Sequence, residues 1–443
     1  MLLSSLAISS QSPYLFPNLR VLKWQYLPVE DPYLAVTMHQ LLSPALVSVS
    51  ALSEWTSNTQ LFLQNYVQLS PRLKLNSLRL FVGVNRDFSE AEIHQLSLGI
   101  STQECLECLE VHIPIDDVAL RGVMLSPQLR VAILVLHPIA SSLSNIHITS
   151  ADIPFRNVKE LELYVRDLHF VSRLLRWQDQ MFKTFRLRFT ALDNTETFFA
   201  LFTALASPQR TDSLQSIRLT CDNPYVPAHD NTSYDHSVHC LAYRTLSPLA
   251  SLKHLRKLEL ILRNPIHLDD GELGELARNW PMLESLTLTC TEGFYGTSVS
   301  LGASVSLGGL SLLLTHCARL RDLSLSIDAR EVPETTKIDV CNMLDISIEL
   351  PDSPIRDARL VADFFSKHLP SVTDIEVPFA DASWLSGEPV EEYESLWSEV
   401  NDYLRAAKVG IYSPKNKHQP YFDRSGHRCE IWTLIYCSCK SGG

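Results

Sequence analysis

The sequence has little positive charge and no long hydrophobic run. Its 443 residues include 38 Lys and Arg against 50 Asp and Glu, which gives a net charge of −12. Such a chain is not expected to bind nucleic acid through bulk electrostatic attraction. No stretch reaches about 18 uninterrupted apolar residues, so neither a transmembrane helix nor a membrane partner is predicted.

Cysteine is also sparse, with ten residues spread thinly over the chain. A secreted disulfide scaffold is short and dense in cysteine, and this sequence is neither. Most of the cysteines lie in or beside apolar runs, which is typical of buried, reduced thiols. The apolar N-terminal residues lack a basic segment and form a short run for a signal peptide. These features predict an intracellular protein, either cytoplasmic or nuclear.

The sequence signatures of catalysis are missing as well. There is no phosphate-binding glycine loop, no HExxH, no nucleophile elbow and no dinucleotide fingerprint. Residue types that bind zinc occur in three places, but none has the spacing of a zinc site. These are His229, Asp230, Asp235, His236, His239 and Cys240; Cys105 and Cys108; and His427, Cys429, Cys437 and Cys439. We predict no enzymatic activity, no cofactor and no metal site. A hydrolase or metal-dependent enzyme in the inserted loops is the alternative of another class.

What the sequence does contain is a leucine-rich internal repeat. Of 71 leucines, 65 lie within the first 350 residues. The pattern apolar-x-x-apolar-x-apolar recurs about every 29 residues, at the upper edge of the leucine-rich range. The units are Leu19/Leu22/Trp24, Leu46/Val49/Ala51, Leu75/Leu78/Leu80, Leu106/Leu109/Val111, Leu129/Ala132/Leu134, Val158/Leu161/Leu163, Phe182/Phe185/Leu187, Leu214/Ile217/Leu219, Leu255/Leu258/Leu260, Leu283/Leu286/Leu288, Leu320/Leu323/Leu325, Cys341/Leu344/Ile346 and Val372/Ile375/Val377.

Each unit combines a strand signal with a helix signal. The last two apolar positions alternate with polar ones, as in a half-buried strand. Between strands, apolar residues take helical spacing over 198–205, 273–280 and 310–317. Asp269 and Glu272 fit a capping box before the second of these helices. One strand and one helix cannot bury their apolar faces alone, so neighbouring units must stack. The predicted fold is α/β: a leucine-rich-repeat solenoid, or horseshoe, with a parallel sheet on its concave side.

The predicted boundaries follow from where the repeat is interrupted or stops. The solenoid, with about 13 irregular repeats, covers residues 1–380. Proline-rich and polar residues at 222–250 and glycine- and serine-rich residues at 291–309 predict two inserted loops. Apolar residues at helical spacing predict a C-terminal capping helix at 381–408, which covers the end of the sheet. Residues 409–443 are expected to form an irregular tail.

The repeats resemble those of F-box leucine-rich-repeat proteins. The resemblance is carried by Trp280-Pro281-x-Leu283-x-x-Leu286-x-Leu288, by His316-Cys317-x-x-Leu320-x-x-Leu323-x-Leu325, and by residues 15–19, 352–355 and 361–372. Their order is similar to that in the large, mostly uncharacterised F-box-type proteins of mushroom-forming fungi. The resemblance implies substrate selection for ubiquitination, with cullin–RING ligase components as partners. The F-box itself, which precedes the repeats in that family, is not found before Leu19.

Protein–protein recognition through the concave face is the function that the repeat predicts. The resemblance makes this the substrate-recognition part of an F-box-type ubiquitin ligase adaptor. The alternative is a stand-alone leucine-rich-repeat scaffold or regulator without ligase linkage. Fold alone does not identify the partner.

Strand alternation places a cluster of charged residues on the concave face. The candidate partner-binding residues are Glu160, Glu162, Tyr164, Arg186, Arg188 and Arg218. One interpretation is that the arginines bind an acidic peptide, because guanidinium groups pair bidentately with carboxylates. The other is that the two glutamates pair with the arginines across the strands and bind nothing else.

Overall fold

The structure is a computed structural model. It describes residues 14–25, 40–54, 57–83, 88–136, 155–166, 168–176, 181–190, 194–208, 210–221, 240–290, 305–333, 346–378 and 390–408.

A twelve-stranded, fully parallel sheet runs the length of the described chain, with its strands in chain order. The strands are β1 (Val21–Gln25), β2 (Ser48–Glu54), β3 (Ser77–Gly83), β4 (Cys108–Ile115), β5 (Val131–Leu136), β6 (Glu160–Val165), β7 (Thr184–Phe189), β8 (Ser216–Cys221), β10 (Lys257–Leu262), β12 (Ser285–Cys290), β13 (Asp322–Leu325) and β14 (Ser347–Glu349). Two short strands, β9 (Leu241–Ala242) and β11 (Ile266–His267), form a separate parallel pair. The predicted parallel sheet is confirmed.

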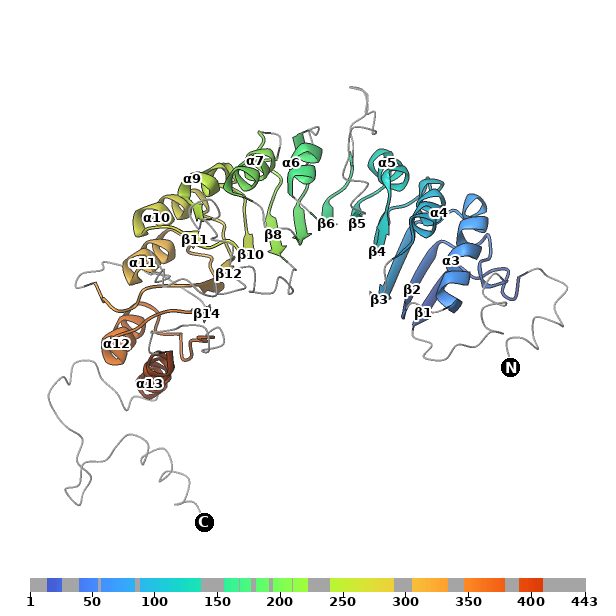
Figure 1. The fold of residues 1–443 in the computed structure, drawn as a ribbon. Coiled ribbons are helices and arrows are strands. Elements are labelled where there is room, and N and C mark those ends of the chain that lie inside the picture. The colour runs from blue at the N-terminus through green and yellow to red at the C-terminus, as the bar shows by residue number, and fades with distance from the viewer. Residues whose placement is uncertain are drawn as a thin grey trace, which may run out of the picture.

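Helices connect the strands and cover one face of the sheet. They are α3 (Ser57–Leu69), α4 (Glu90–Ser101), α5 (Asp117–Leu125), α6 (Leu168–Arg176), α7 (Thr195–Leu205), α9 (Tyr243–Leu246), α10 (Asp270–Asn279), α11 (Leu307–His316), α12 (Ala358–His368) and α13 (Val390–Lys408), with the 3-10 turns η1 (Ser70–Arg72) and η4 (Ser247–Ser251). Figure 1 shows the elements following an arc, with the strands on its inner, concave side and the helices outside. The three predicted helical segments correspond to α7, α10 and α11.

Local sequence fixes where several helices begin. At α10, the Asp269 side chain accepts a hydrogen bond from the Glu272 N–H at 2.8 Å, and the Glu272 carboxylate accepts one from the Asp269 N–H at 3.0 Å. This is the capping box that the sequence predicts. Ser89 and Glu92 form the same arrangement at α4. Such caps satisfy N–H groups that have no partner inside the helix, which stabilises the helix start by about 1 kcal/mol.

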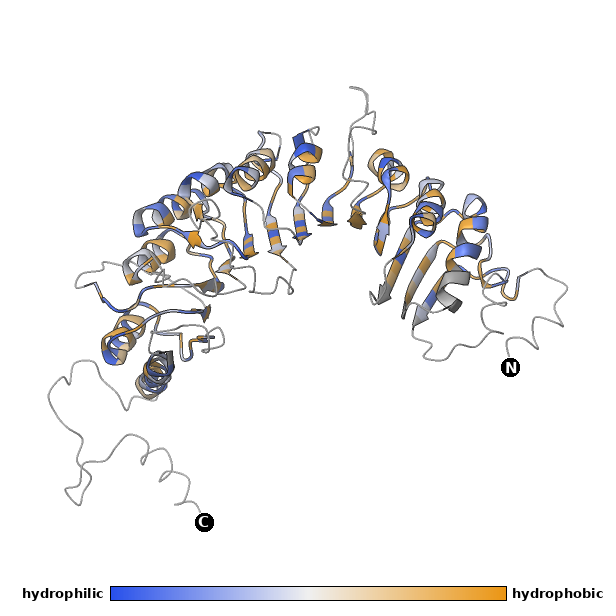
Figure 2. Cartoon of the chain, viewed as in Figure 1, coloured by the Kyte–Doolittle hydropathy of each residue, from blue (hydrophilic) through white to orange (hydrophobic). Residues whose placement is uncertain are grey.

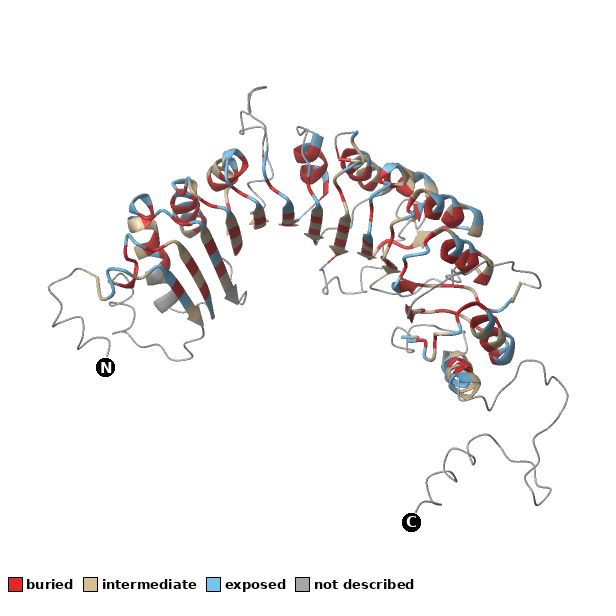
Figure 3. Cartoon of the chain, turned by 180° about the vertical axis from the view of Figure 1, so that it is seen from behind, coloured by how far each residue is buried: buried red, intermediate tan, exposed pale blue. Residues whose placement is uncertain are grey.

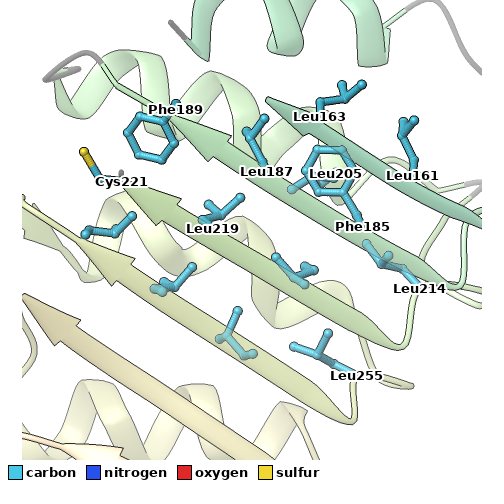
Figure 4. Packing of buried hydrophobic residues seen from close by; sticks show 14 of the residues in the cluster. Leu161, Leu163, Phe185, Leu187, Phe189, Leu205, Leu214, Leu219, Cys221 and Leu255 are labelled. Carbon is cyan, nitrogen blue, oxygen red and sulfur yellow. The ribbon is translucent and has the colours of Figure 1, made fainter. Parts of the chain in front are cut away.

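The core lies between the sheet and the helices. Leu163, Leu187, Leu219 and Leu260 occupy one row across neighbouring strands, and all four side chains are fully buried. Figure 4 shows three of them pointing to the same side of the sheet. Hydrophobic and hydrophilic residues alternate along the central strands (Figure 2), and buried residues concentrate in the strands and on the inner sides of the helices (Figure 3). Each leucine that leaves water in this way contributes roughly 1.5–3 kcal/mol.

A repeated backbone contact sets the start of each strand. The Val47 carbonyl accepts hydrogen bonds from the N–H groups of Asn76 and Ser77, and the Asn76 carbonyl accepts from those of Glu107 and Cys108. The same step recurs from unit to unit across the central sheet. The turns therefore stack in register, and the concave side chains of one strand lie opposite those of the next.

Two predicted units differ from the structure. β14 begins at Ser347, and Ile348 lies opposite Leu323, so the twelfth unit is shifted by four residues from the predicted Leu344 and Ile346. Alternating apolar residues allow shifts by even numbers without changing faces, so spacing alone does not select the register. In the thirteenth unit Ile375 is buried as predicted, but only an isolated bridge forms beside it.

Parts of the two predicted loops belong to regular elements instead. Residues 241–250 belong to β9, α9 and η4, with Leu241, Leu246 and Leu249 fully or almost fully buried. The sequence predicted a loop here because the polar residues before them dominate the composition of the range 222–250. At the second loop, Val305 is buried and Ser306 caps α11. Residues 222–239, 291–304 and 409–443 lie outside the described residues.

The last helix packs onto the preceding repeat. α13 lies beside α12, and the Trp397 indole N–H donates to the Ser353 carbonyl at 2.8 Å. The Asn401 side chain pairs with both the N–H and the carbonyl of Ile375, at 2.9 and 3.0 Å. An amide side chain thus satisfies backbone groups at the end of the sheet, as an additional strand would. The helix predicted at 381–408 is found at Val390–Lys408, and 381–389 lie outside the described residues.

Candidate functional site

Side chains at alternate strand positions form rows across the concave face. Because the strands are parallel and in register, residues of one row are cross-strand neighbours. The central row runs through Lys23, Ser50, Arg79, Glu110, Ile133, Glu162, Arg186, Arg218, Glu259, Thr287 and Ser324. Its charged residues are concentrated between β6 and β10.

An open hollow of about 180 Å³ lies on this face between β6 and β8. Its lining residues are Glu162, Arg186, Leu187, Arg188, Arg218 and Thr220. Four of the six predicted site residues therefore line one hollow. We call it the arginine hollow.

Carboxylates on the flanking strands hold the arginines in place. One carboxylate oxygen of Glu162 lies 3.4 Å from an Arg186 nitrogen, and the other carboxylate oxygen lies 3.9 Å from the Arg188 Nε. On the other side, Glu259 of β10 lies 3.2 Å from Arg218. The two glutamate side chains are 12% and 25% exposed, whereas the three arginine side chains are 41–43% exposed. The arginine side chains are thus more exposed to solvent than those of the two glutamates, although the Nε atom of Arg218 is buried.

Arg186 and Arg218 are neighbours across the line between β7 and β8, which we call the seam, and no carboxylate of the central row lies between them. They are direct cross-strand partners on β7 and β8, with Glu162 and Glu259 on their outer sides. Like charges opposite each other in a sheet repel and destabilise it. The Thr220 hydroxyl at the same hollow is buried and has no hydrogen-bond partner within the described residues. The seam is therefore a place where an added acceptor would be stabilised.

The predicted cross-strand pairing is confirmed for Glu162 and not found for Glu160. Glu160 lies opposite Thr184, is exposed, and does not line the arginine hollow. It sits two residues too early along β6 to reach the arginine row. Glu259 of β10 supplies the second carboxylate instead. The sequence offered a sign of this, because strand alternation places Glu259 on the concave face.

An aromatic shelf, formed by Phe81, His112 and Tyr164, leads to the arginine hollow. The rings of Phe81 and His112 stack at 4.6 Å, and His112 meets the edge of Tyr164 at 5.4 Å. The Arg188 guanidinium lies over the Tyr164 ring at 5.1 Å from its centre. The sequence placed Tyr164 on the concave face, but its contact with a ring of β4, across the intervening β5, depends on tertiary structure.

A bulge in β4 accompanies the contact between His112 and Tyr164. The register with β5 shifts between Val111 and Pro114, and proline cannot donate a ladder hydrogen bond. Bulges bend a strand and redirect its side chains. Val135 of the intervening strand is half-buried and lies opposite Tyr164, so the shelf is apolar between its rings.

Metal-binding residues do not gather within the described part of the chain, which contains no group of three or more His, Cys, Asp or Glu suited to a metal ion. Cys108 begins β4, where its sulfur accepts a hydrogen bond from Arg79 at 3.9 Å, and Cys105 lies in the preceding turn. The histidines between 229 and 239 and the cysteines beyond 409 lie outside the described residues.

Comparisons with known proteins give no family for this chain. No protein-family model matches it, and no curated protein matches it. Among the described helices, none combines the length and apolar character needed to cross a membrane.

Proposed function

We propose that this chain is a protein-recognition module that binds its partner on the concave face of the sheet. The arginine hollow carries the proposal, because it gathers exposed guanidinium groups on a curved surface that side chains only partly fill. Parallel stacked repeats expose such extended concave surfaces, and repeat proteins use them for binding.

The finer fold assignment supports the same function. Strand and helix alternate at the leucine-rich period, so we assign the fold to leucine-rich-repeat solenoids, with α13 as the C-terminal cap. The resemblance of the repeats to F-box leucine-rich-repeat proteins of mushroom-forming fungi supports a more specific role. In that role, an intracellular chain selects substrates for a cullin–RING ubiquitin ligase.

The test is affinity capture from native lysate, combined with an amine-reactive cross-linker and mass spectrometry. Lys257 stands exposed at the start of β10 on the concave side, whereas Lys408 ends α13. The proposal predicts partner cross-links at Lys257 in preference to Lys408. Cullin–RING components among the captured proteins would support the ligase role, and their absence beside a concave-face partner would favour a scaffold without ligase linkage.

A charge-reversal variant tests whether capture depends on the arginine hollow. Arg186→Glu, Arg188→Glu and Arg218→Glu together should abolish capture while circular dichroism shows an unchanged fold. The control is Arg256→Glu, because Arg256, just before β10, is 45% exposed and pairs with the carboxylate of Glu284 in the next repeat, outside the hollow. Equal capture by the triple variant and the control would refute the hollow as the binding site.

A further inference from the structure

We infer that the partner presents an extended acidic peptide, with a side-chain carboxylate of Asp or Glu in the arginine hollow and an apolar side chain on the aromatic shelf. The inference rests on the proposed recognition role of the concave face and specifies the chemistry of the segment that binds there.

Charge is the first argument. From β6 to β10 the central row reads Glu162, Arg186, Arg218, Glu259, so two positive residues are adjacent and are flanked by two negative ones. A carboxylate at the seam contacts both guanidinium groups and relieves their repulsion. The flanking glutamates are less exposed than the arginines, so an incoming anion approaches the guanidinium groups from the solvent side.

The balance of charge favours a carboxylate over a phosphate. Together with Arg188, the five side chains carry three positive and two negative charges, a net charge of +1. A carboxylate of charge −1 neutralises this, whereas a phosphomonoester carries about −1.5 to −2. The net charge of −12 on the chain opposes a polyanion such as nucleic acid. The open hollow, of about 180 Å³, has room for one acidic side chain.

The aromatic shelf supplies the second contact. Tyr164 lies under Arg188, and its ring adjoins His112, so apolar surface ends where the arginine hollow begins. Neighbouring strands are ~4.8 Å apart, so the seam between β7 and β8 lies ~7 Å from β6, the strand of Tyr164. Tyr164 also lies two residues further along its strand than the row of Arg186 and Arg218, which adds a similar distance in the strand direction. The resulting separation of ~10 Å matches about three residues of an extended peptide. The expected segment therefore has an apolar residue two or three positions from an acidic one.

Peptide pools test this inference on the full-length chain. Each pool contains degenerate nine-residue peptides with amidated C-termini and one fixed central residue: Glu, Asp, Gln, Asn, Lys or phosphoserine. Binding to the labelled chain should be roughly tenfold or more stronger for the Glu and Asp pools than for the Gln and Asn pools, the effect of a charge-assisted hydrogen bond. In a second library with central Glu, Leu, Phe or Tyr should be enriched two or three positions away.

Two variants separate binding from a structural role. Arg186→Glu with Arg218→Glu should reverse the preference toward the Lys pool, whereas Arg256→Glu should leave it unchanged. Loss of the fold does not produce a reversed preference, so reversal identifies the hollow as the charge-reading site. Tyr164→Ala should remove the apolar enrichment while the preference for Glu and Asp remains.

The outcomes distinguish this inference from the proposed function. If the phosphoserine pool bound most strongly, the group recognised by the arginine hollow would be a phosphate and not a carboxylate. Equal binding of all pools, or no pool binding, while captured partners still cross-link at Lys257, would overturn the acidic peptide and leave the recognition role intact. Absence of both peptide binding and concave-face cross-links would overturn the proposed function itself.

Discussion

Arg210 offers the sharpest test of how two neighbouring repeats are held together. Its side chain is fully buried, and its guanidinium donates to the carbonyls of Leu175, at 2.6 Å, and Ala204. These carbonyls lie in the last turns of α6 and α7, where partners within the helix run out. The residue four positions after Ala204 is Pro208, which has no N–H to donate. The Phe182 ring also lies 5.8 Å from the guanidinium.

The expected cost of Arg210→Met follows from these contacts. Two hydrogen bonds from a charged donor contribute about 1.5–3 kcal/mol each, which sets an upper figure of about 6 kcal/mol. Methionine fills similar space and no longer requires burial of a charge, which offsets part of this loss. We expect a net destabilisation of about 2–4 kcal/mol. Arg210→Lys should lie between Met and the native residue, because a single ammonium lacks the planar fork that serves two acceptors.

Hydrogen exchange is the appropriate assay, because repeat arrays can open locally rather than all at once. Amides of α6 and α7 should exchange roughly 30- to 700-fold faster in Arg210→Met, while those of α10 and α11 change little. Arg186→Met, at an exposed site, should shift stability by no more than about 0.5 kcal/mol. Unchanged exchange in α6 and α7 would refute the reasoning, since it would mean that dehydrating the charge costs as much as the two hydrogen bonds contribute.

Three further predictions test burial at other points of the fold. Burial raises the pKa of the Cys317 thiol to about 12, so iodoacetamide at pH 8 should label half-buried Cys108 while Cys317 stays unmodified in the folded protein. Burial, and then the charge of Lys367, lowers the pKa of His368 below 6.5 in the folded chain. As the pH falls, the unfolded chain therefore binds the proton at a higher pH than the folded chain does, and the free energy of unfolding should decrease from pH 7 through 6.5 toward 5. In His368→Leu, unfolding in urea should show less of this pH dependence. Trp397→Ala should cost about 3–5 kcal/mol and detach α13 in exchange measurements, and normal protection of α13 would contradict its docking through this side chain.

The repeat pattern determined most of the architecture. The residues at the second and third apolar positions, such as Leu258 and Leu260, are both buried side by side in β10 because period-2 alternation leaves one face for the core. Asp269 and Glu272 determined a helix start in the same direct way, since the cap involves groups only three residues apart. Where apolar residues continued at even spacing, as around Ile348, the same rule left the register open.

Tertiary structure decided the composition of the site. The sequence places Arg186, Arg188 and Arg218 on the concave face, because alternation along a strand is local information. Which carboxylate meets them depends on the registers of β6, β7, β8 and β10, and these bring Glu162 and Glu259 to the row while leaving Glu160 outside it. Pairing between strands 24 to 41 residues apart is set by how the turns stack, so the counter-charges and the contact of His112 with Tyr164 emerge only in the folded chain.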